Sequence, residues 1–453
     1  MNLFNSLRQR EADNKPIRIG VIGAGTFGEM FLAQARLTPG MKLVGVAELD
    51  LVKARQACLD AGWPAEAIGS ESSSSAINDG AAGGKIILTD NPEALIKADL
   101  DVVIEITGKA EAGAYHAWTA IENGKHVIMV NIEADALLGR VLNQKAGEKG
   151  LIYSLAYGDQ PAIICELIDW ARTIGVEVVC AGKGTRYQPE YRYSTPETVW
   201  EHFGFSEAQL ASGKFNPQMY NSFLDGTKSA IEMCALANAT GLVPQPAGLG
   251  FPPVGVQDLA NVLKPLSAGG ILEHSGTVEV VASEQRDGSP IEGHMRWGVY
   301  VVFRATSGHM RRFLAMHDFV KDASGEYGAA YRPYHLIGLE LGISVATVAL
   351  RGEATGTASC LVADVAAVAK KDLKTGDSLD GEGGYTVYGR LVRADKSITG
   401  DYLPIGLSQG GKLRRTVNKD SILTYQDVTL DVNTFSYRMR RRLEDDFKSG
   451  IGH

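Results

Sequence analysis

The sequence predicts an α/β protein in which an N-terminal Rossmann-type, doubly wound parallel sheet is followed by an α+β domain and a small all-β module. Three observations carry this prediction: a glycine turn between an apolar run and a helical pattern, strands that alternate with helices over the first ~150 residues, and dense turn signals near the C-terminus. A chain of 453 residues is also too long for one ordinary core. We place the domains at 1–156 for dinucleotide binding, 157–356 for substrate binding and dimerisation, and 357–453 for the β module and tail.

The glycine turn stands in the stretch IRIGVIGAGTFG, residues 17–28. An apolar run leads into three glycines, and the residues after them recur at helical spacing, which predicts a strand, a tight turn and a helix. Glycines at this spacing let the backbone turn sharply and approach a pyrophosphate at the helix N-terminus. The motif alone is weak, because similar turns occur without a ligand, but the flanking strand and helix favour dinucleotide binding. The predicted cofactor loop comprises Gly23, Gly25, Thr26, Phe27 and Gly28.

A second strand, residues 43–47, ends at two carboxylates. A carboxylate about 20 residues after the glycines is placed to bond the adenosine ribose hydroxyls, so Glu48 or Asp50 is the candidate. A carboxylate there favours NAD, whereas the nearby Lys53 and Arg55 could accommodate the additional phosphate of NADP. Both cofactors stay open at this stage, with NADP expected and NAD as the alternative.

Further strands and helices complete the predicted sheet. Because strands and helices alternate, the sheet is expected to be parallel and doubly wound, with its chemistry beyond the carboxyl ends of the strands. The serine-rich segment 70–84 lacks apolar periodicity and is expected to be a loop without chemistry. The expected strands are 86–88, 101–106, 126–130 and 152–156, and the expected helices are 110–123 and 134–148.

Polar residues follow three successive strands of this sheet. Because the carboxyl ends of parallel strands meet at one edge, these side chains are expected to converge. Asn131 and Glu133 are also ordinary residues at a helix start, so helix capping is the alternative for both. Glu105 lies within an apolar strand and is expected to be a paired buried acid. The three groups are Glu105, Thr107 and Gly108; Asn131, Glu133 and Asp135; and Tyr157, Gly158 and Asp159.

The second domain begins with a predicted helix, 161–175, and a strand, 177–185, in which Lys183 stands between two glycines. A helix is expected over 222–240, where Asp225, Lys228 and Glu232 would share one face. A narrow charged stripe on an otherwise apolar helix favours a wet cavity and an active-site role. The alternative is an exposed salt bridge between residues one turn apart.

Several cations between residues 182 and 228 predict an anionic substrate: Arg186, Arg192, Lys214 and Lys228. The Pro- and Gly-rich segment 241–265 is expected to be an ordered loop. Strands 276–282 and 297–304 are expected to pair antiparallel, and helix 333–350 to close this domain. An apolar linker helix over 358–370 would then lead to short strands within 372–425.

Composition limits the function classes. The net charge of −8 argues against nucleic acid as a partner, and the basic run 438–442 is followed by acids, which is typical of a solvated helix. Five scattered cysteines without CxxC spacing indicate a reducing compartment, and a catalytic thiol is not expected. No apolar run reaches the roughly 18 residues of a membrane span, and the N-terminus does not resemble a signal peptide. We therefore expect a cytoplasmic protein that does not bind membranes.

Several blocks of this sequence resemble homoserine-dehydrogenase-like oxidoreductases with a C-terminal SAF domain, and in particular the 1-deoxy-D-xylulose 5-phosphate reductoisomerase-like enzymes. The resemblance covers nearly the whole chain. It implies NADPH as the reductant, a divalent metal (magnesium or manganese) as a helper, and a homodimer. The blocks are GVIGAGTFGEMFLAQ, VIEITGKAEAGAYHAWTAIENGKHVIMVNIEADALLG, AYGDQPAIICELIDWA, SFLDGTKSAIEMCALANATGL, KKDLKTGDSLDGEGGYTVYGRL and LPIGL.

The implied reaction converts 1-deoxy-D-xylulose 5-phosphate to 2-C-methyl-D-erythritol 4-phosphate in isoprenoid precursor synthesis. Lysines or a metal would polarise the substrate oxygens, and carboxylates would hold the metal or move the proton. The alternatives are a simple dehydrogenase of a small hydroxy acid, sugar acid or semialdehyde, and a non-catalytic cofactor-binding protein. The expected roles are oxyanion stabilisation for Lys183 and Lys228, metal or acid–base chemistry for Asp225 and Glu133, substrate orientation for Asn131 and Asp159, and phosphate binding for arginines such as Arg186 or Arg192.

Overall fold

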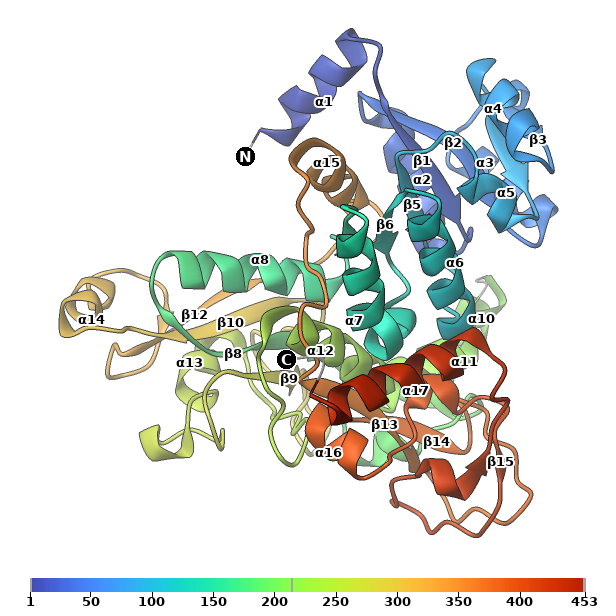
Figure 1. The fold of residues 1–453 in the computed structure, drawn as a ribbon. Helices are drawn as coiled ribbons and strands as arrows, with labels where there is room; N and C mark the ends of the chain where they lie inside the picture. Colours follow the sequence, from blue (N-terminus) through green and yellow to red (C-terminus); the bar gives the residue numbers. More distant parts are fainter. Residues whose placement is uncertain (1, 213–214, 451–453) are drawn as a thin grey trace. The chain divides into compact units, whose positions relative to one another are not determined.

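The computed structural model describes residues 2–212 and 215–450 (Figure 1). The chain forms two compact units that interleave along the sequence. The first contains the residues up to Ile163 together with His335–Ser359, and the second contains Ile164–Tyr334 together with the residues from Cys360 onward. Each unit is described by itself below.

A parallel seven-stranded sheet forms the centre of the first unit, in the order β3-β4-β2-β1-β5-β6-β7. Its apolar runs are buried on both faces, as parallel strands covered by helices require. The doubly wound sheet predicted from the sequence is confirmed. The strands are β1 (Ile17–Ile22), β2 (Met41–Ala47), β3 (Ile68–Ser70), β4 (Ile86–Thr89), β5 (Val102–Glu105), β6 (His126–Met129) and β7 (Tyr153–Leu155).

The helices of this unit connect successive strands. The chain leaves β1 toward β2 on one side and later returns to place β5 on the other side, so the strand order switches beside β1. In open α/β sheets the crevice at such a switch point is where ligands bind. The helices are α1 (Leu3–Ala12), α2 (Thr26–Leu37), α3 (Leu51–Asp60), α4 (Ser74–Ala82), α5 (Pro92–Ile96), α6 (Ala110–Glu122), α7 (Ile132–Glu148) and the start of α8 (Gln160–Thr173).

Two predictions for this part of the chain are wrong. Residues 70–84 are not a loop, because α4 begins after Ser73, whose hydroxyl accepts the Ala76 N–H, and buries Ile77 and Ala81 on one face. The helix predicted to close the second domain, α15 (Leu341–Arg351), instead packs in the first unit. Its Leu341, with Val345 and Val348, belongs to the same buried cluster as the β1 side chains.

The second unit is built on a mixed sheet in the order β11-β12-β10-β8-β9. The predicted antiparallel pairing of residues 276–282 with 297–304 is wrong, because β8 lies between the two strands and pairs parallel with β9 and antiparallel with β10. The predicted strand at 177–185 is confirmed. The strands are β8 (Glu177–Thr185), β9 (Thr277–Ala282), β10 (Val299–Arg304), β11 (Val320–Lys321) and β12 (Tyr327–Arg332).

The helix predicted over 222–240 is two helices, α11 (Pro217–Leu224) and α12 (Thr227–Thr240). The chain breaks at Gly226, whose φ of 87° lies in the left-handed region that favours glycine. Asp225 therefore stands between the helices as the C-cap of α11, and only Lys228 and Glu232 lie on α12. Shorter helices of this unit are η2 (Pro189–Tyr193), α9 (Val199–Phe203), α10 (Glu207–Ser212), α13 (Leu259–Val262) and α14 (Gly308–Ala315).

The C-terminal part of the second unit is a small β module, as predicted, but its first element differs. Residues predicted as an apolar linker helix form β13 (Ala363–Ala369), which pairs antiparallel with β14 (Val387–Arg393). The α12 helix packs against both strands (Figure 1). The module also contains β15 (Lys412–Leu413), β16 (Val428–Thr429), α16 (Ala394–Thr399) and α17 (Phe435–Lys448).

The basic run in α17 is only partly solvated, contrary to the prediction. The Arg440 side chain is 1% exposed and forms ion pairs with Asp364 of β13 and Glu444 of its own helix. This arginine ties the last helix to the module, which a run of charges in the sequence does not reveal. In the part of the chain that the structure describes, no helix is long and apolar enough to cross a membrane.

Candidate functional site

The glycine turn has the geometry that a dinucleotide requires. Gly23 has a φ of 105°, and a Cβ there would come within 3.0 Å of the Ile106 backbone; a Cβ on Gly28 would lie 3.1 Å from the Gly23 carbonyl oxygen. Gly25, in contrast, faces open space, with no atom within 4 Å of the position of a Cβ. The first and third glycines thus serve packing, and the second leaves room at the start of α2 for a phosphate group.

The two carboxylates after β2 have different roles. Asp50 is the N-cap of α3, and its carboxylate accepts the Val52 and Lys53 N–H groups at 3.0 Å each. Glu48 instead turns toward the glycine turn, where its Oε2 accepts the Ala24 N–H at 2.9 Å. Glu48 is therefore the better placed of the two for a ribose, and the sequence did not distinguish them.

The polar groups after β5 and β6 form one connected network. The Thr107 hydroxyl donates to Glu105 at 2.5 Å, and the Asn131 amide donates to the Thr107 hydroxyl at 3.2 Å. Asn131 also caps α7, because its side-chain oxygen accepts the Ala134 N–H at 3.1 Å. The capping alternative is thus confirmed for Asn131. Gly108 follows with a φ of 64° and completes the turn beside the switch point.

Glu105 is the buried acid of this network. It is fully buried, and its Oε1 also lies 3.3 Å from His116 Nδ1. Its Oε2 is buried and has no hydrogen-bond partner among the described residues. Through the bond that it accepts from the Thr107 hydroxyl, Glu105 therefore fixes the side chain of Thr107, a predicted cofactor residue.

The acids near the start of α7 and α8 differ in exposure. Glu133 is half-buried in the first turn of α7, whereas Asp135 is buried and accepts the Tyr153 hydroxyl at 2.9 Å. Burial raises the pKa of Asp135 to about 7. Asp159 is half-buried directly before α8, and its Oδ1 accepts the Gln160 N–H at 2.9 Å. Glu133 and Asp159 are thus partly exposed to solvent, whereas Asp135 is not.

In the second unit, Lys183 of β8 forms a buried ion pair with Glu232 of α12. Their side chains are 4% and 3% exposed. The glycines on either side of Lys183 are required by packing, because a Cβ on Gly182 or Gly184 would strike the backbone of Glu279 or Met295. The salt-bridge alternative predicted from the sequence, an exposed pair within one helix, is therefore wrong: the pair is buried and joins strand to helix.

Asp225 takes part in a second buried ion pair. Its Oδ2 lies 2.7 Å from the Lys370 ammonium, and its Oδ1 accepts the Thr227 N–H at 2.9 Å. Lys370 also donates to the carbonyl oxygens of Ser194 and Gly384. Burial raises the pKa of Asp225, and the lysine opposes that rise.

The predicted charged stripe therefore does not exist as one face of one helix. Lys228 is half-buried on α12, one turn before Glu232. At about 100° per residue, Ala230 lies roughly 200° around the helix from both of these residues. The α12 helix thus turns Lys228 and Glu232 to one side and Gly226 with Ala230 to the other.

The predicted substrate cations are spread over different surroundings. Arg186 lies 2.8 Å from Glu284 in an ion pair. Arg192 donates to the Pro189 carbonyl oxygen and to the Tyr187 hydroxyl, and it lines a cavity with Asp225. Lys214 lies outside the described residues.

A divalent metal has no evident ligand set in the described residues. Within 2–212 and 215–450, no three His, Cys, Asp or Glu side chains gather as a metal site requires. Asp225, the predicted ligand, is already neutralised by Lys370. The described residues therefore show no preformed ligand cluster for the expected magnesium or manganese.

Sequence reasoning missed Lys370, Tyr388 and Arg390. Lys370 could not be found, because its partner lies 145 positions earlier in the sequence and nothing local links the two. Tyr388 and Arg390 offered a signal: they are two apart in a strand and so share a face, within the distinctive block GEGGYTVYGRL. Both line the same cavity as Asp225 and Arg192.

Two family models match the chain. Residues 19–155 match the model described as "Homoserine dehydrogenase, NAD binding domain", and residues 158–341 match "Oxidoreductase DRL, catalytic domain". No curated protein gives a significant sequence match. Together with the glycine turn, the two models indicate an NAD-binding domain of the dehydrogenase type followed by a segment similar to an oxidoreductase catalytic domain. Neither model covers the C-terminal module.

Solved structures give only distant matches. Scyllo-inositol dehydrogenase from Lactobacillus casei, with NAD(H) and scyllo-inositol bound, is 14% identical; the alignment covers 76% of this chain and 92% of that one, with a TM-score of 0.36. A putative oxidoreductase from Klebsiella pneumoniae is 17% identical, with 76% and 88% covered and a TM-score of 0.34. For the first three matched structures the alignment spans 46–49% of their length. Such scores carry no conclusion about activity.

Proposed function

We propose that this NAD(P)-dependent oxidoreductase is a reductoisomerase that converts 1-deoxy-D-xylulose 5-phosphate to 2-C-methyl-D-erythritol 4-phosphate with NADPH. The observation that carries the proposal is the buried Lys183–Glu232 pair inside the segment that matches an oxidoreductase DRL catalytic domain. The resemblance of the DGTK and GEGGYTVYGRL blocks to the reductoisomerase-like enzymes supports the same reaction.

The reaction places defined demands on the protein. The bond between the hydroxyl-bearing carbon next to the ketone and the carbon beyond it must break, and a new bond must form between that further carbon and the ketone carbon. The hydroxyl-bearing carbon loses its hydroxyl proton and becomes the aldehyde of a branched skeleton, the former ketone oxygen takes up a proton, and a hydride from the cofactor then reduces the aldehyde. Negative charge develops on the ketone and aldehyde oxygens in the course of both steps. Cationic donors fixed in a dry environment stabilise such charge far better than water does.

Lysines supply these donors in the proposed mechanism. The Lys183 ammonium has three N–H donors, one of which is held by Glu232, and burial removes competing water. Lys228 stands one turn before Glu232 and is proposed as the second donor. In the nucleotide-binding unit, Asp159 is proposed to orient the substrate, with Glu133 as acid or base. Asn131, the other residue expected there, is buried and its side chain is bonded to Thr107, Lys109 and Ala134, so it is proposed to fix the loop beside the substrate.

NADPH is proposed because of the resemblance, whereas the position of Glu48 favours NAD. The Glu48 carboxylate, which could repel a 2′-phosphate, is held by the N–H groups of Ala24 and Leu49. Lys53 is exposed in the first turn of α3 and is the cation proposed for that phosphate. Arg55 is turned to the carbonyl oxygens of Ala65 and Ile68 instead.

From the same resemblance we also propose a homodimer and a SAF domain for the C-terminal module, and from the sequence a cytoplasmic location. Light scattering of the purified chain tests the homodimer.

A second candidate function is a simple dehydrogenase of a small hydroxy acid or semialdehyde. It is favoured by the match of residues 19–155 to the NAD-binding domain of homoserine dehydrogenase.

Lysine variants test the proposed chemistry. The experiment measures NADPH oxidation with 1-deoxy-D-xylulose 5-phosphate and identifies the product by mass spectrometry and NMR. Loss of a single oxyanion donor lowers kcat by about 10²–10³, so Lys183→Met and Lys228→Met are each expected to fall by that factor. The double variant Lys183→Met with Glu232→Gln avoids leaving an unpaired buried carboxylate and is expected to be equally inactive.

The matched control is Lys264→Met. Lys264 forms a comparable partly buried ion pair in the same unit, with Asp322 at 2.9 Å, but has no proposed role in catalysis. Its variant should keep near-normal kcat. An unbranched product would favour the simple dehydrogenase, and normal turnover in the folded Lys183 and Lys228 variants would remove both lysines from the mechanism.

A further inference from the structure

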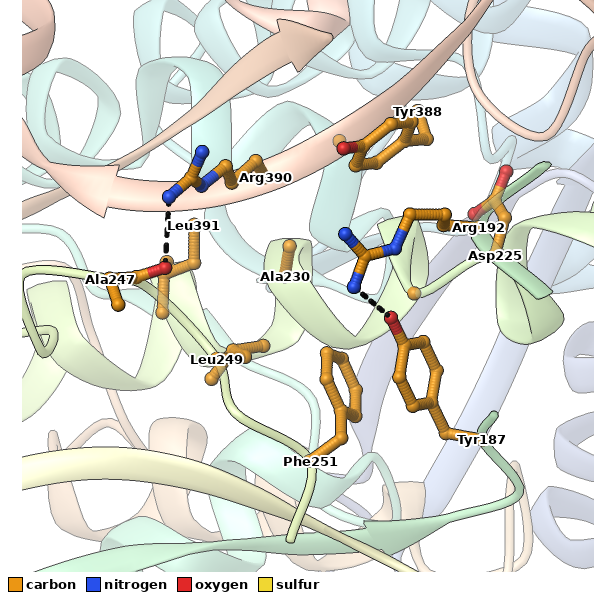
Figure 2. A pocket seen from close by; sticks show the side chains of 12 residues that line it. Tyr187, Arg192, Asp225, Ala230, Ala247, Leu249, Phe251, Tyr388, Arg390 and Leu391 are labelled. Atoms are coloured by element: carbon orange, nitrogen blue, oxygen red, sulfur yellow. Dashed lines mark hydrogen bonds between the residues drawn. The ribbon is translucent and has the colours of Figure 1, made fainter. Parts of the chain in front are cut away.

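A cavity of about 170 Å³ lies in the second unit between α12 and β14 (Figure 2). Four segments line it: the residues around η2, the start of α12 with Asp225 before it, the loop after α12, and strand β14 of the C-terminal module. None of the residues that line the cavity has a part in the proposed lysine chemistry. The lining residues that matter most are Tyr187, Arg192, Asp225, Phe251, Tyr388 and Arg390.

Two arginines enter the cavity from different elements. Figure 2 shows Arg192 and Arg390 on either side of the space above Ala230. Arg192 is fixed by bonds to the Pro189 carbonyl and the Tyr187 hydroxyl, and Arg390 by a bond of 3.1 Å to the Ala247 carbonyl. A guanidinium has five N–H donors, so both arginines keep donors for a ligand after these bonds.

The charge of the cavity is positive. Among the described residues, Asp225 is the one acid that lines it, and the Lys370 ammonium pairs with that carboxylate at 2.7 Å. The two guanidinium charges are therefore not balanced by the other residues that line the cavity. Tyr187 and Tyr388 add two hydroxyls to the lining, and burial raises the pKa of both, that of Tyr388 to about 12.

An aromatic wall gives the cavity a fixed shape. The rings of Tyr187 and Phe251 stack with centroids 3.8 Å apart. Phe251 has a φ of 48°, uncommon for a bulky residue, and the buried Glu279 carboxylate holds it by accepting the N–H groups of Gly250 and Phe251. Such strain persists only where the surroundings enforce it, and it is typical of ligand-binding positions.

The cavity and the lysine pair lie on different sides of α12. Gly226 and Ala230 line the cavity, whereas Lys228 and Glu232 lie roughly 200° around the helix. The C-terminal module supplies Tyr388 and Arg390, which are two apart on β14 and share a face. This cavity is thus completed by the module whose role the sequence left undetermined.

We propose that this cavity binds the phosphate of a small phosphate monoester between Arg192 and Arg390, with the Tyr388 hydroxyl as a further donor. Two guanidinium groups match the charge of a phosphate dianion and reach different oxygens of its tetrahedron. A cavity of about 170 Å³ suits a compact sugar or polyol phosphate. The proposal does not depend on the reductoisomerase reaction.

Calorimetric titration of the purified full chain with inorganic phosphate, without cofactor, tests this proposal. Removal of one charge-assisted contact is expected to weaken binding by about 10- to 100-fold in Arg192→Met and in Arg390→Met. Arg393→Met is the matched control, because Arg393 lies on the same strand and pairs with Asp395 outside the cavity. Its affinity for phosphate should equal that of the unmodified protein.

Unchanged phosphate affinity in both cavity variants would overturn the proposal, as would acetate binding as tightly as phosphate. Melting temperatures show whether an arginine variant is folded. If one is not, Tyr388→Phe serves as the test instead: it nearly keeps the volume of the side chain, removes the proposed hydroxyl donor, and should weaken phosphate binding by a smaller factor.

The phosphate can belong to the reaction's substrate or to a separate effector, and kinetics separates the two. Inorganic phosphate that competes with 1-deoxy-D-xylulose 5-phosphate identifies the substrate's own phosphate. A change in kcat without competition identifies an effector. If the chain shows no reductoisomerase activity, the titration still decides whether the phosphate site exists.

Discussion

At the scale of single residues, the glycine turn was predictable because its function depends on local backbone geometry. The spacing of the three glycines fixes which one packs, which one turns and which one faces the ligand, and the structure agrees. The buried ion pairs were not predictable. Asp225 with Lys370, and Asp364 with Arg440, join residues more than 70 positions apart, and a sequence pattern records only near neighbours.

Alanine substitutions at two glycines of the turn should have different effects, one on cofactor binding and the other on stability. Gly25→Ala should abolish binding of NADPH and NADH, because its Cβ enters the space left for the pyrophosphate, while the free energy of unfolding falls by about 1 kcal/mol or less. Gly28→Ala should instead destabilise the protein by about 1–3 kcal/mol, since its Cβ meets the Gly23 carbonyl oxygen. Fluorescence titration and thermal melting measure the two effects. Normal cofactor affinity in Gly25→Ala would contradict the assignment of this loop.

Asp135 makes stability depend on pH. Burial raises its pKa from 3.8 to about 7, so the folded protein binds this proton more tightly than the unfolded chain does. The resulting stability is complete below about pH 4 and is lost as the pH rises through 7.

Asp135→Asn cannot lose that proton. The variant should therefore gain stability relative to the unmodified protein as the pH rises, by about 2–4 kcal/mol at pH 8. Urea unfolding followed from pH 4 to pH 8 measures the difference. A difference that does not change with pH would show that Asp135 is not the group responsible.

At the scale of elements, strands were predicted better than helices. A buried strand appears in the sequence as a short apolar run, and all but one of the strands of the parallel sheet were predicted from such a run. The strand that was missed, β3, is three residues long. The prediction of one helix over 222–240 was wrong at the Asp-Gly pair, because this pair is a turn signal within a pattern that otherwise suits a single helix. The prediction of a helix over 358–370 was wrong because an apolar run that short suits a helix and a buried strand equally well.

The placement of α15 in the first unit has a measurable consequence. Leu341 is fully buried among side chains of the parallel sheet, whereas Leu339, just before the helix, is 45% exposed. Leu341→Ala is expected to cost about 2–5 kcal/mol, and Leu339→Ala less than about 1 kcal/mol. Hydrogen exchange should show the loss of protection in β1 and β2. Exchange that increases only in the second unit would contradict this packing.

At the scale of the whole molecule, the fold class followed from the sequence but the path of the chain did not. The segment around α15 returns to the first unit after the chain has formed most of the second, and the C-terminal module then returns to pack on α12. Returns of this kind depend on long-range packing, for which a single sequence carries no local pattern. The polar groups of the candidate site were found where they follow strands, and missed where they arrive from such a returning segment.

The central claim is that the hydride reduces an aldehyde formed by rearrangement of the carbon skeleton. NADPH carrying deuterium on the transferred position of its nicotinamide, supplied with 1-deoxy-D-xylulose 5-phosphate, tests it most directly. We predict a branched product with deuterium on its new primary alcohol carbon. Deuterium on a secondary alcohol carbon of an unbranched product would contradict the claim and identify a simple dehydrogenase.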